Sequence, residues 1–255
     1  MPGSFAFGWD AAETARTYEH FCERHDRYRR ANAELLTDAE LFSAAQVLDF
    51  AAGTGRTAEA ALKTLGSDGR VLCVEPARAM RAIGQRRVTD PRVAWSPELP
   101  AEGTFDRVLC GAALWQMDEI ERVVAELSAL VRPGGRLCFT LVASYVGAAE
   151  GDDGMAAFAP ALARLAEGRA PRAEASFAAP TLERILAALS PLRATTRPFT
   201  HRQTAEEYRD WLKIPVLTDA LLPDLSPDER ARRIDAAFAG LRAEREETWI
   251  VVTAT

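Results

Sequence analysis

The amino-acid sequence predicts a doubly wound α/β fold built on a mostly parallel, seven-stranded sheet. Short apolar runs alternate with helix-like segments through residues 47–142, which is typical of parallel strands joined by crossover helices. The first apolar run leads into a glycine-rich turn, Ala51-Ala52-Gly53-Thr54-Gly55. The composition, with 48% hydrophobic and 27% charged residues, is that of an ordinary globular chain.

Each element follows from its own pattern of apolar and turn-forming residues. Strands are expected at 47–50, 71–75, 92–95, 105–110, 136–142, 193–200 and 249–252. Helices are expected at 11–40, 56–65, 77–86, 119–131, 155–167 and 181–189, with a turn at 132–135. Two later helices carry capping-box signatures at their starts, Thr204-x-x-Glu207 and Ser226-x-x-Glu229.

We expect these elements to form a single domain over residues 1–255, because 255 residues suffice for one large core with a cap. Residues 40–145 or so would form the core. Residues 1–39, with the N-terminal helices, and 146–245 would form a helical cap and substrate elements. Residues 246–254 would form the closing strand.

Charge and composition exclude several function classes. A net charge of −6 offers no basic footprint for nucleic acid, and no apolar run is long enough to span a membrane. The start of the chain lacks a secretory signal, so a cytoplasmic location is expected. Cys22, Cys73, Cys110 and Cys138 show no Cys-x-x-Cys spacing, and neither a metal site nor a disulfide is expected. A small-molecule partner and a monomer or homodimer are expected instead.

The glycine-rich turn predicts a nucleotide-type ligand. Glycine lets a ligand approach the backbone closely, and the helix that follows offers free N–H groups. Glu75 ends the next strand, 20 residues after Gly55, where a carboxylate can accept both hydroxyls of a ribose. Gly53-x-Gly55-x-x-Ala58 also fits the dinucleotide fingerprint, so a NAD-dependent oxidoreductase remains an alternative.

Four segments in order resemble the motifs of class I S-adenosylmethionine-dependent methyltransferases. They are Val47–Gly55, Val71–Met80, Phe105–Val108 and Leu130–Leu137. The resemblance implies a Rossmann-like fold, with S-adenosyl-L-methionine as cofactor and S-adenosyl-L-homocysteine as product. It implies methyl transfer to a small molecule by in-line displacement.

The resemblance also implies a set of cofactor-binding residues. Asp49, Ala51, Gly53 and Gly55 would surround the methionine half, and Glu75 would hold the ribose. Pro76 and Met80 would pack on the adenine, with Trp95 and Ser96 where the family often reads the adenine amino group. Cys110, with Gly111, would lie under the sulfonium, while Tyr18 and Trp115 would line the site.

Two departures from the family pattern carry expectations of their own. Ala51 replaces the usual first glycine, which is tolerated where φ is negative. Trp95 either stacks on the purine or packs as a buried strand-end aromatic. Leu114-Trp115-Gln116 replaces a segment that often contains histidine, so no base is expected there.

The catalytic residue is left open, with Tyr18, Tyr145 and His201 as candidates. Tyr28, Tyr208 and Trp211 are further candidates on the acceptor side, and Arg29 or Arg30 for the cofactor carboxylate. Other reactions of the same cofactor, such as cyclisation or transfer of another group, and a non-catalytic cofactor-binding protein remain alternatives.

Overall fold

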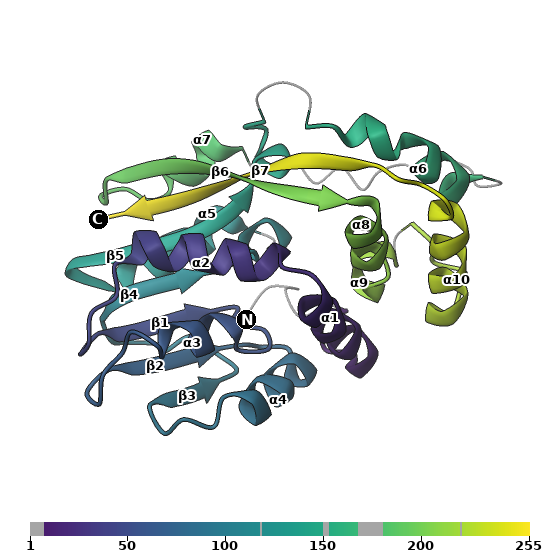
Figure 1. Ribbon diagram of the computed structural model, residues 1–255. Coiled ribbons are helices and arrows are strands. Elements are labelled where there is room, and N and C mark those ends of the chain that lie inside the picture. The colour runs from purple at the N-terminus through teal and green to yellow at the C-terminus, as the bar shows by residue number, and fades with distance from the viewer. Residues whose placement is uncertain (1–7, 118, 150–152, 168–180, 220) are drawn as a thin grey trace.

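The computed structural model describes residues 8–117, 119–149, 153–167, 181–219 and 221–255. Seven strands form one sheet in the order β3-β2-β1-β4-β5-β7-β6 (Figure 1). The strands are β1 Gln46–Phe50, β2 Arg70–Val74, β3 Val93–Ser96, β4 Phe105–Cys110, β5 Val131–Val142, β6 Ala194–Thr204 and β7 Glu244–Ala254. Strands β1 to β5 pair in parallel, whereas β7 is antiparallel to both β5 and β6. The predicted fold class is therefore confirmed.

Helices cover both faces of the sheet because successive strand residues point to opposite sides. Val47 faces a cluster with Leu35 of α2 (Arg27–Ala39) and Ala58 of α3 (Arg56–Ala61). Leu48 faces the opposite cluster, with Val124 of α5 (Ile120–Ala129) and α7 (Leu182–Ala187). These central strands are buried on both sides, which explains their continuous apolar runs.

The N-terminal segment forms two helices rather than the single helix expected at 11–40. The first helix, α1, runs from Ala12 to Arg24, and the second begins at Arg27. His25 has extended backbone angles, which end α1 and redirect the chain. Helix α4 (Arg78–Arg87) follows β2, and α1 packs against it at the carboxyl edge of the sheet (Figure 1).

The hairpin of β6 and β7 extends beyond the rest of the sheet. β5 pairs with β7 only as far as Trp249, whereas β6 continues to pair with β7 up to Thr204 and Glu244. Helices α8 Ala205–Leu212, α9 Pro215–Thr218 and α10 Pro227–Phe238 fill the connection between the two strands. They pack with α6 (Ala159–Ala166), so the cap is built from two separate segments (Figure 1).

Other local differences have physical reasons. The turn expected at 132–135 lies within β5 as an irregularity, where Gly134 has a φ of +77° and the register with β4 shifts. Ser226 and Glu229 form the full capping box, whereas Thr204 and Glu207 form only one of its two hydrogen bonds. Thr204 caps α8, whereas the Glu207 carboxylate turns to His201 instead. No helix among the described residues is long and apolar enough to cross a membrane.

Candidate functional site

A cavity of about 470 Å³ opens at the carboxyl ends of β1, β2 and β4, where doubly wound sheets bind ligands. A second hollow of about 310 Å³ shares much of its wall. The first is lined by Trp9, Tyr18, Tyr28, Ala51, Gly53, Glu75, Met80, Gly111, Ala112, Ala113 and Gln116. The second adds Asn32, Ala52, Thr54, Arg56 and Thr57. Apolar, aromatic and polar groups meet in these walls, as they do in small-molecule and cofactor sites.

Glu75 links the glycine loop to the second strand. Its Oε2 accepts a hydrogen bond from the Gly53 N–H at 2.8 Å, and its Oε1 accepts one from the Ala77 N–H at 2.8 Å. Burial raises the pKa of Glu75 to about 7, although these two bonds act against that rise. The carboxylate is thus held at the cavity wall with lone pairs still available to a ligand's hydroxyl groups.

Asp49 is a buried carboxylate whose Oδ2 has no hydrogen-bond partner in the described part of the chain. It lies near the end of β1 and is 1% exposed. Burial, together with the negative charge of Glu75, raises the pKa of Asp49 to about 8, against the N–H of Ala58. A buried acceptor of this kind is costly unless a donor or a cation faces it.

Two alanines at the cavity have left-handed backbone conformations. Ala51, which follows β1, has a φ of +55°, and Ala112, just beyond β4, also has a φ of +55°. The expectation that φ is negative at Ala51 is therefore wrong. The turn keeps the geometry that a glycine would supply, and each alanine adds about 1–2 kcal/mol of strain. Such strain concentrates at functional sites.

Aromatic side chains of the N-terminal segment form one wall of the cavity. The rings of Trp9 and Tyr18 meet edge to face at 5.6 Å, and those of Tyr18 and Tyr28 lie 5.4 Å apart. The Trp9 Nε1 donates to Gln116 Oε1 at 2.8 Å, which joins this wall to the segment after β4. Packing raises the pKa of Tyr18 well above its ordinary value, so its hydroxyl stays protonated at neutral pH.

Five of the twelve expected cofactor residues line this cavity: Tyr18, Ala51, Gly53, Glu75 and Met80. Asp49 is buried close to the loop, and Gly55 begins α3. A Cβ built at Gly53 would have no neighbour nearer than Met80 Cε at 3.6 Å, so this glycine faces open space. A Cβ at Gly55 would lie 3.1 Å from the Trp95 ring, so this glycine serves helix packing.

Trp95, Ser96 and Pro76 are not among the residues that line the two hollows. The Trp95 ring packs so closely on α4 that a Cβ at Gly84 would lie 2.2 Å from it. Of the two expectations for this residue, the buried strand-end aromatic fits this packing. The Ser96 hydroxyl is engaged with Glu98 in a turn.

The remaining expected residues also lie outside the lining. Cys110 is fully buried in the core. Trp115 and Tyr145 meet at 5.6 Å, and Trp115 also packs on Trp249 at 5.7 Å. His201 is 3% exposed, with its Nε2 held 3.0 Å from both carboxylate oxygens of Glu207.

The acceptor-side expectations have a mixed outcome. Tyr28 lines the cavity, and its hydroxyl accepts a hydrogen bond from Trp211 Nε1 at 3.0 Å. Arg29 and Arg30 are exposed, so neither reaches the cavity. Arg56 lies in the wall of the second hollow instead, where its guanidinium also pairs with Glu19.

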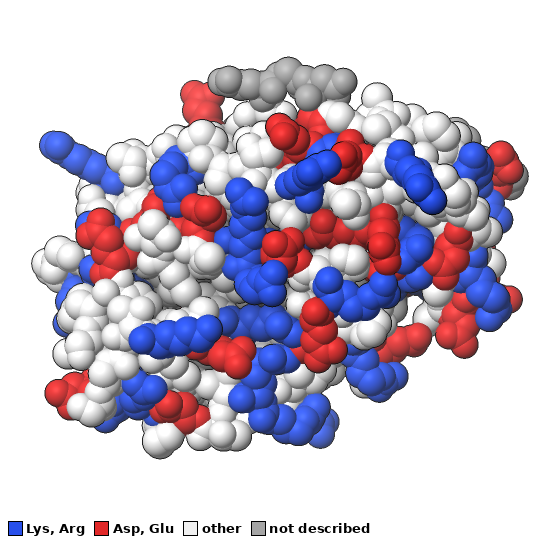
Figure 2. Space-filling view, in the orientation of Figure 1, with Lys and Arg blue, Asp and Glu red and all other residues white. Residues whose placement is uncertain are grey.

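The sequence analysis did not identify Trp9, Asn32 or Gln116 as residues of the site. Asn32 lies one helical turn after Tyr28, so helical spacing could have indicated it. Ala112 and Ala113 follow β4, which pairs with β1, so the rule that ligands bind at the carboxyl edge could have found them. On the face shown in Figure 2, acidic and basic residues alternate rather than forming a field of one sign.

Comparison with known proteins gives matches over the central part of the chain. Residues 48–139 match the methyltransferase domain family. A ubiquinone/menaquinone biosynthesis C-methyltransferase, UbiE, of Bordetella parapertussis is 34% identical over 99 residues, which are 36% of this chain and 38% of that protein. The chain thus matches only about two fifths of the length of this relative. On these matches and motifs, the central part of the chain, residues 48–139, is similar to methyltransferase domains.

Solved structures share the fold at low sequence identity. The [4+2]-cyclase SpnF has a TM-score of 0.59 at 16% identity, covering 100% of this chain and 96% of its own. A phosphoethanolamine-type N-methyltransferase 2 of Haemonchus contortus, solved with S-adenosylhomocysteine, has a TM-score of 0.51 at 16% identity, covering 89% and 52%. At this level of identity the similarity concerns the fold alone.

Proposed function

We propose that this protein binds S-adenosylmethionine in the described cavity and transfers its methyl group to a small molecule. The observation that carries this proposal is the pair of buried carboxylates beside the glycine loop. Glu75 lies in the cavity wall, and Asp49 has an unpartnered oxygen next to the same loop. Few ligands carry hydrogen-bond donors for two such carboxyl groups, and a nucleoside with an attached amino acid is one that does.

The residues present fit that cofactor. Its two ribose hydroxyls are donors for Glu75, and its ammonium group is a donor and cation for the side of the loop where Asp49 lies. Arg56, Asn32 and Thr57 supply a cation and polar groups for its carboxylate. Met80 and the aromatic wall supply the apolar surface for its base.

The same geometry disfavours a dinucleotide. A pyrophosphate needs free backbone N–H groups at the glycine loop. Here the Gly53 N–H donates to Glu75 and the Gly55 N–H donates to the Ala52 carbonyl at 2.9 Å. The ionised form of Glu75 would also repel a pyrophosphate.

The bound cofactor supplies an activated methyl group, so the chain has to align the acceptor and exclude water. The aromatic wall of Trp9, Tyr18 and Tyr28 performs both tasks in this proposal. Both tyrosines have raised pKa values because they are buried, so neither is a base at neutral pH. We therefore propose an acceptor that reacts without a protein base, such as an already ionised group or an electron-rich carbon.

Calorimetric titration with S-adenosylmethionine, S-adenosylhomocysteine and NAD tests the cofactor. We expect micromolar binding of the two sulfur nucleotides and none of NAD. Gly53→Val should abolish binding, because its side chain would enter the cavity. Gly134→Val is the matched control, since Gly134 also has a positive φ but lies in open space away from the site. Binding of NAD alone would refute the proposal, as would equal binding by both variants.

Turnover distinguishes methyl transfer from the other reactions of this cofactor. A panel of phenolic, quinol and amine acceptors should yield products heavier by one methyl group together with S-adenosylhomocysteine. Conversion of the acceptor without formation of S-adenosylhomocysteine would instead indicate a reaction such as cyclisation.

A further inference from the structure

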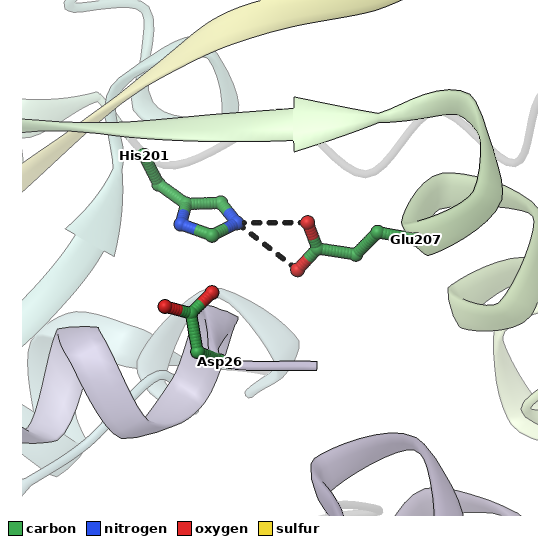
Figure 3. Close-up of side chains that lie close together, drawn as sticks. All are labelled: Asp26, His201 and Glu207. Atoms are coloured by element: carbon green, nitrogen blue, oxygen red, sulfur yellow. Dashed lines mark hydrogen bonds and ion pairs between the residues drawn. The ribbon is translucent and has the colours of Figure 1, made fainter. Parts of the chain in front are cut away.

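Three side chains from segments far apart in the sequence converge beside the cap (Figure 3). Asp26 precedes α2, His201 lies on β6 and Glu207 lies in the first turn of α8. One ligand atom from each lies within 4.8 Å of the other two. His201 and Glu207 are 3% and 5% exposed, whereas Asp26 reaches solvent. An ion could therefore enter past Asp26 toward the two buried ligands.

The charge around this triad is out of balance. Glu207 forms no ion pair with a lysine or arginine in the described part of the chain, and Asp26 meets only Arg29, at 3.7 Å. The buried cation further along, Arg27, is paired with Glu247 at 2.9 Å, which Arg245 also meets, and its charge reaches Glu207 at longer range. The triad thus brings two carboxylates and one imidazole together with no direct arginine or lysine partner at Glu207 among the described residues, an arrangement that a bound cation would stabilise.

A second histidine–carboxylate pair in the same region shows the contrast. His25 Nε2 lies 3.0 Å from Asp210 Oδ2, the same separation as between His201 and Glu207. Asp210, however, also meets Arg24 at 3.0 Å, as well as Arg209 of its own helix and Lys213 just after that helix. Direct ion pairs neutralise Asp210, whereas Glu207 has no direct arginine or lysine partner among the described residues.

We propose that Asp26, His201 and Glu207 bind a divalent transition-metal ion, with Zn²⁺ the best match to one imidazole and two carboxylates. Two carboxylates balance its charge. Ligand atoms around Zn²⁺ lie about 3.4 Å apart at tetrahedral angles, so the triad needs only small side-chain movements. A water would complete the coordination. The sequence analysis expected no metal site because the cysteines show no Cys-x-x-Cys spacing, and that argument did not consider a site made of histidine and carboxylates.

The ion would tie the cap to the wall of the cofactor cavity. Asp26 lies two residues before Tyr28, which lines the cavity and accepts a hydrogen bond from Trp211 of α8. Glu207 lies on that same helix, α8. Metal binding would hold α8 and β6 against the start of α2 and so fix the position of Tyr28.

Titration of chelator-treated, untagged protein with ZnCl₂ in a calorimeter, without cofactor, tests the site. We expect one equivalent of Zn²⁺ to bind and MgCl₂ not to compete. Asp26→Asn removes an exposed ligand without disturbing the core, and Glu207→Gln removes a buried one. Loss of a direct ligand should exceed the roughly 10–100-fold loss known for outer-shell partners. Asp228→Asn, an exposed carboxylate at the start of α10, is the matched control and should bind like the wild type.

A thermal melt gives an independent reading. Zn²⁺ should raise the unfolding midpoint of the wild type and of Asp228→Asn but not that of Asp26→Asn. The proposal is overturned if the wild type binds no Zn²⁺, if Asp26→Asn binds as tightly as the wild type, or if Mg²⁺ competes equally. Because no cofactor is present, the result is independent of the proposed methyl transfer.

Discussion

Burial of the Asp49 carboxyl group lowers the free energy of unfolding at neutral pH, and Asp49→Asn should remove this destabilisation. Its carboxylate has one oxygen without a partner and a pKa of about 8, against an ordinary value of 3.8. Between about pH 4 and pH 8 the unfolded chain is ionised at this residue, whereas the folded protein retains the proton. Stability from this group is therefore fully present below pH 4 and is lost as the pH rises through 8.

The magnitude follows from these two pKa values. Each pH unit between them costs about 1.4 kcal/mol, so the penalty at pH 7 is about 4 kcal/mol. The asparagine introduces an amide N–H that lacks a partner, which costs about 1–3 kcal/mol. Asp49→Asn should therefore stabilise the ligand-free protein by about 1–3 kcal/mol at pH 7. At about 2–4 °C per kcal/mol, the melting temperature should rise measurably.

Chemical unfolding of the wild type and the variant at pH 5, 6 and 7 checks this reasoning. The stability difference should grow by about 1.4 kcal/mol per pH unit in favour of the variant. Its affinity for S-adenosylhomocysteine should fall at the same time, because the amide has one oxygen acceptor where the carboxyl group has two. A difference that does not change with pH, or a variant less stable at every pH, would refute the assignment of a raised pKa to Asp49.

Two further substitutions test the geometry of the site. Ala51→Gly should stabilise the protein by roughly 0.5–1 kcal/mol in urea unfolding, because relief of left-handed strain exceeds the entropy that glycine adds to the unfolded chain; a loss of stability would contradict the strain. Gly84→Ala should destabilise it by about 1–2 kcal/mol, because a Cβ there meets the Trp95 ring. S-adenosylhomocysteine affinity should stay within about twofold in Gly84→Ala, and a larger change would place Trp95 at the cofactor.

The fold was predictable because each strand of the core is a short continuous run of apolar residues. Runs such as Val71–Val74 are apolar on both faces, a pattern typical of a buried parallel strand. The break between α1 and α2 was missed because Phe21, Cys22 and Tyr28 keep helical spacing across it. The chain ends α1 through the backbone of His25, which has no strong sequence signature.

The cofactor side of the site was predictable to the extent that its residues lie in one continuous motif. Gly53 and Glu75 follow consecutive strands and are linked by one hydrogen bond, so their spacing along the chain was enough to predict that they lie close together. The rest of the wall, with Trp9 and Gln116, depends on how distant segments pack. Even within the motif, the conformation of Ala51 followed from the turn rather than from the preference of alanine.

The larger part of the cap, α8–α10, leaves and re-enters the sheet at one point, because Thr204 and Glu244 are register partners at the end of the β6–β7 hairpin. In topological terms α8–α10 are a long hairpin loop, and the entropy of closing such a loop rises only slowly with its length. Modular exchange of this insertion should leave the sheet intact, provided that α6 is exchanged with it. Acceptor selectivity could then be engineered, or diversify in evolution, without any change at Gly53 and Glu75.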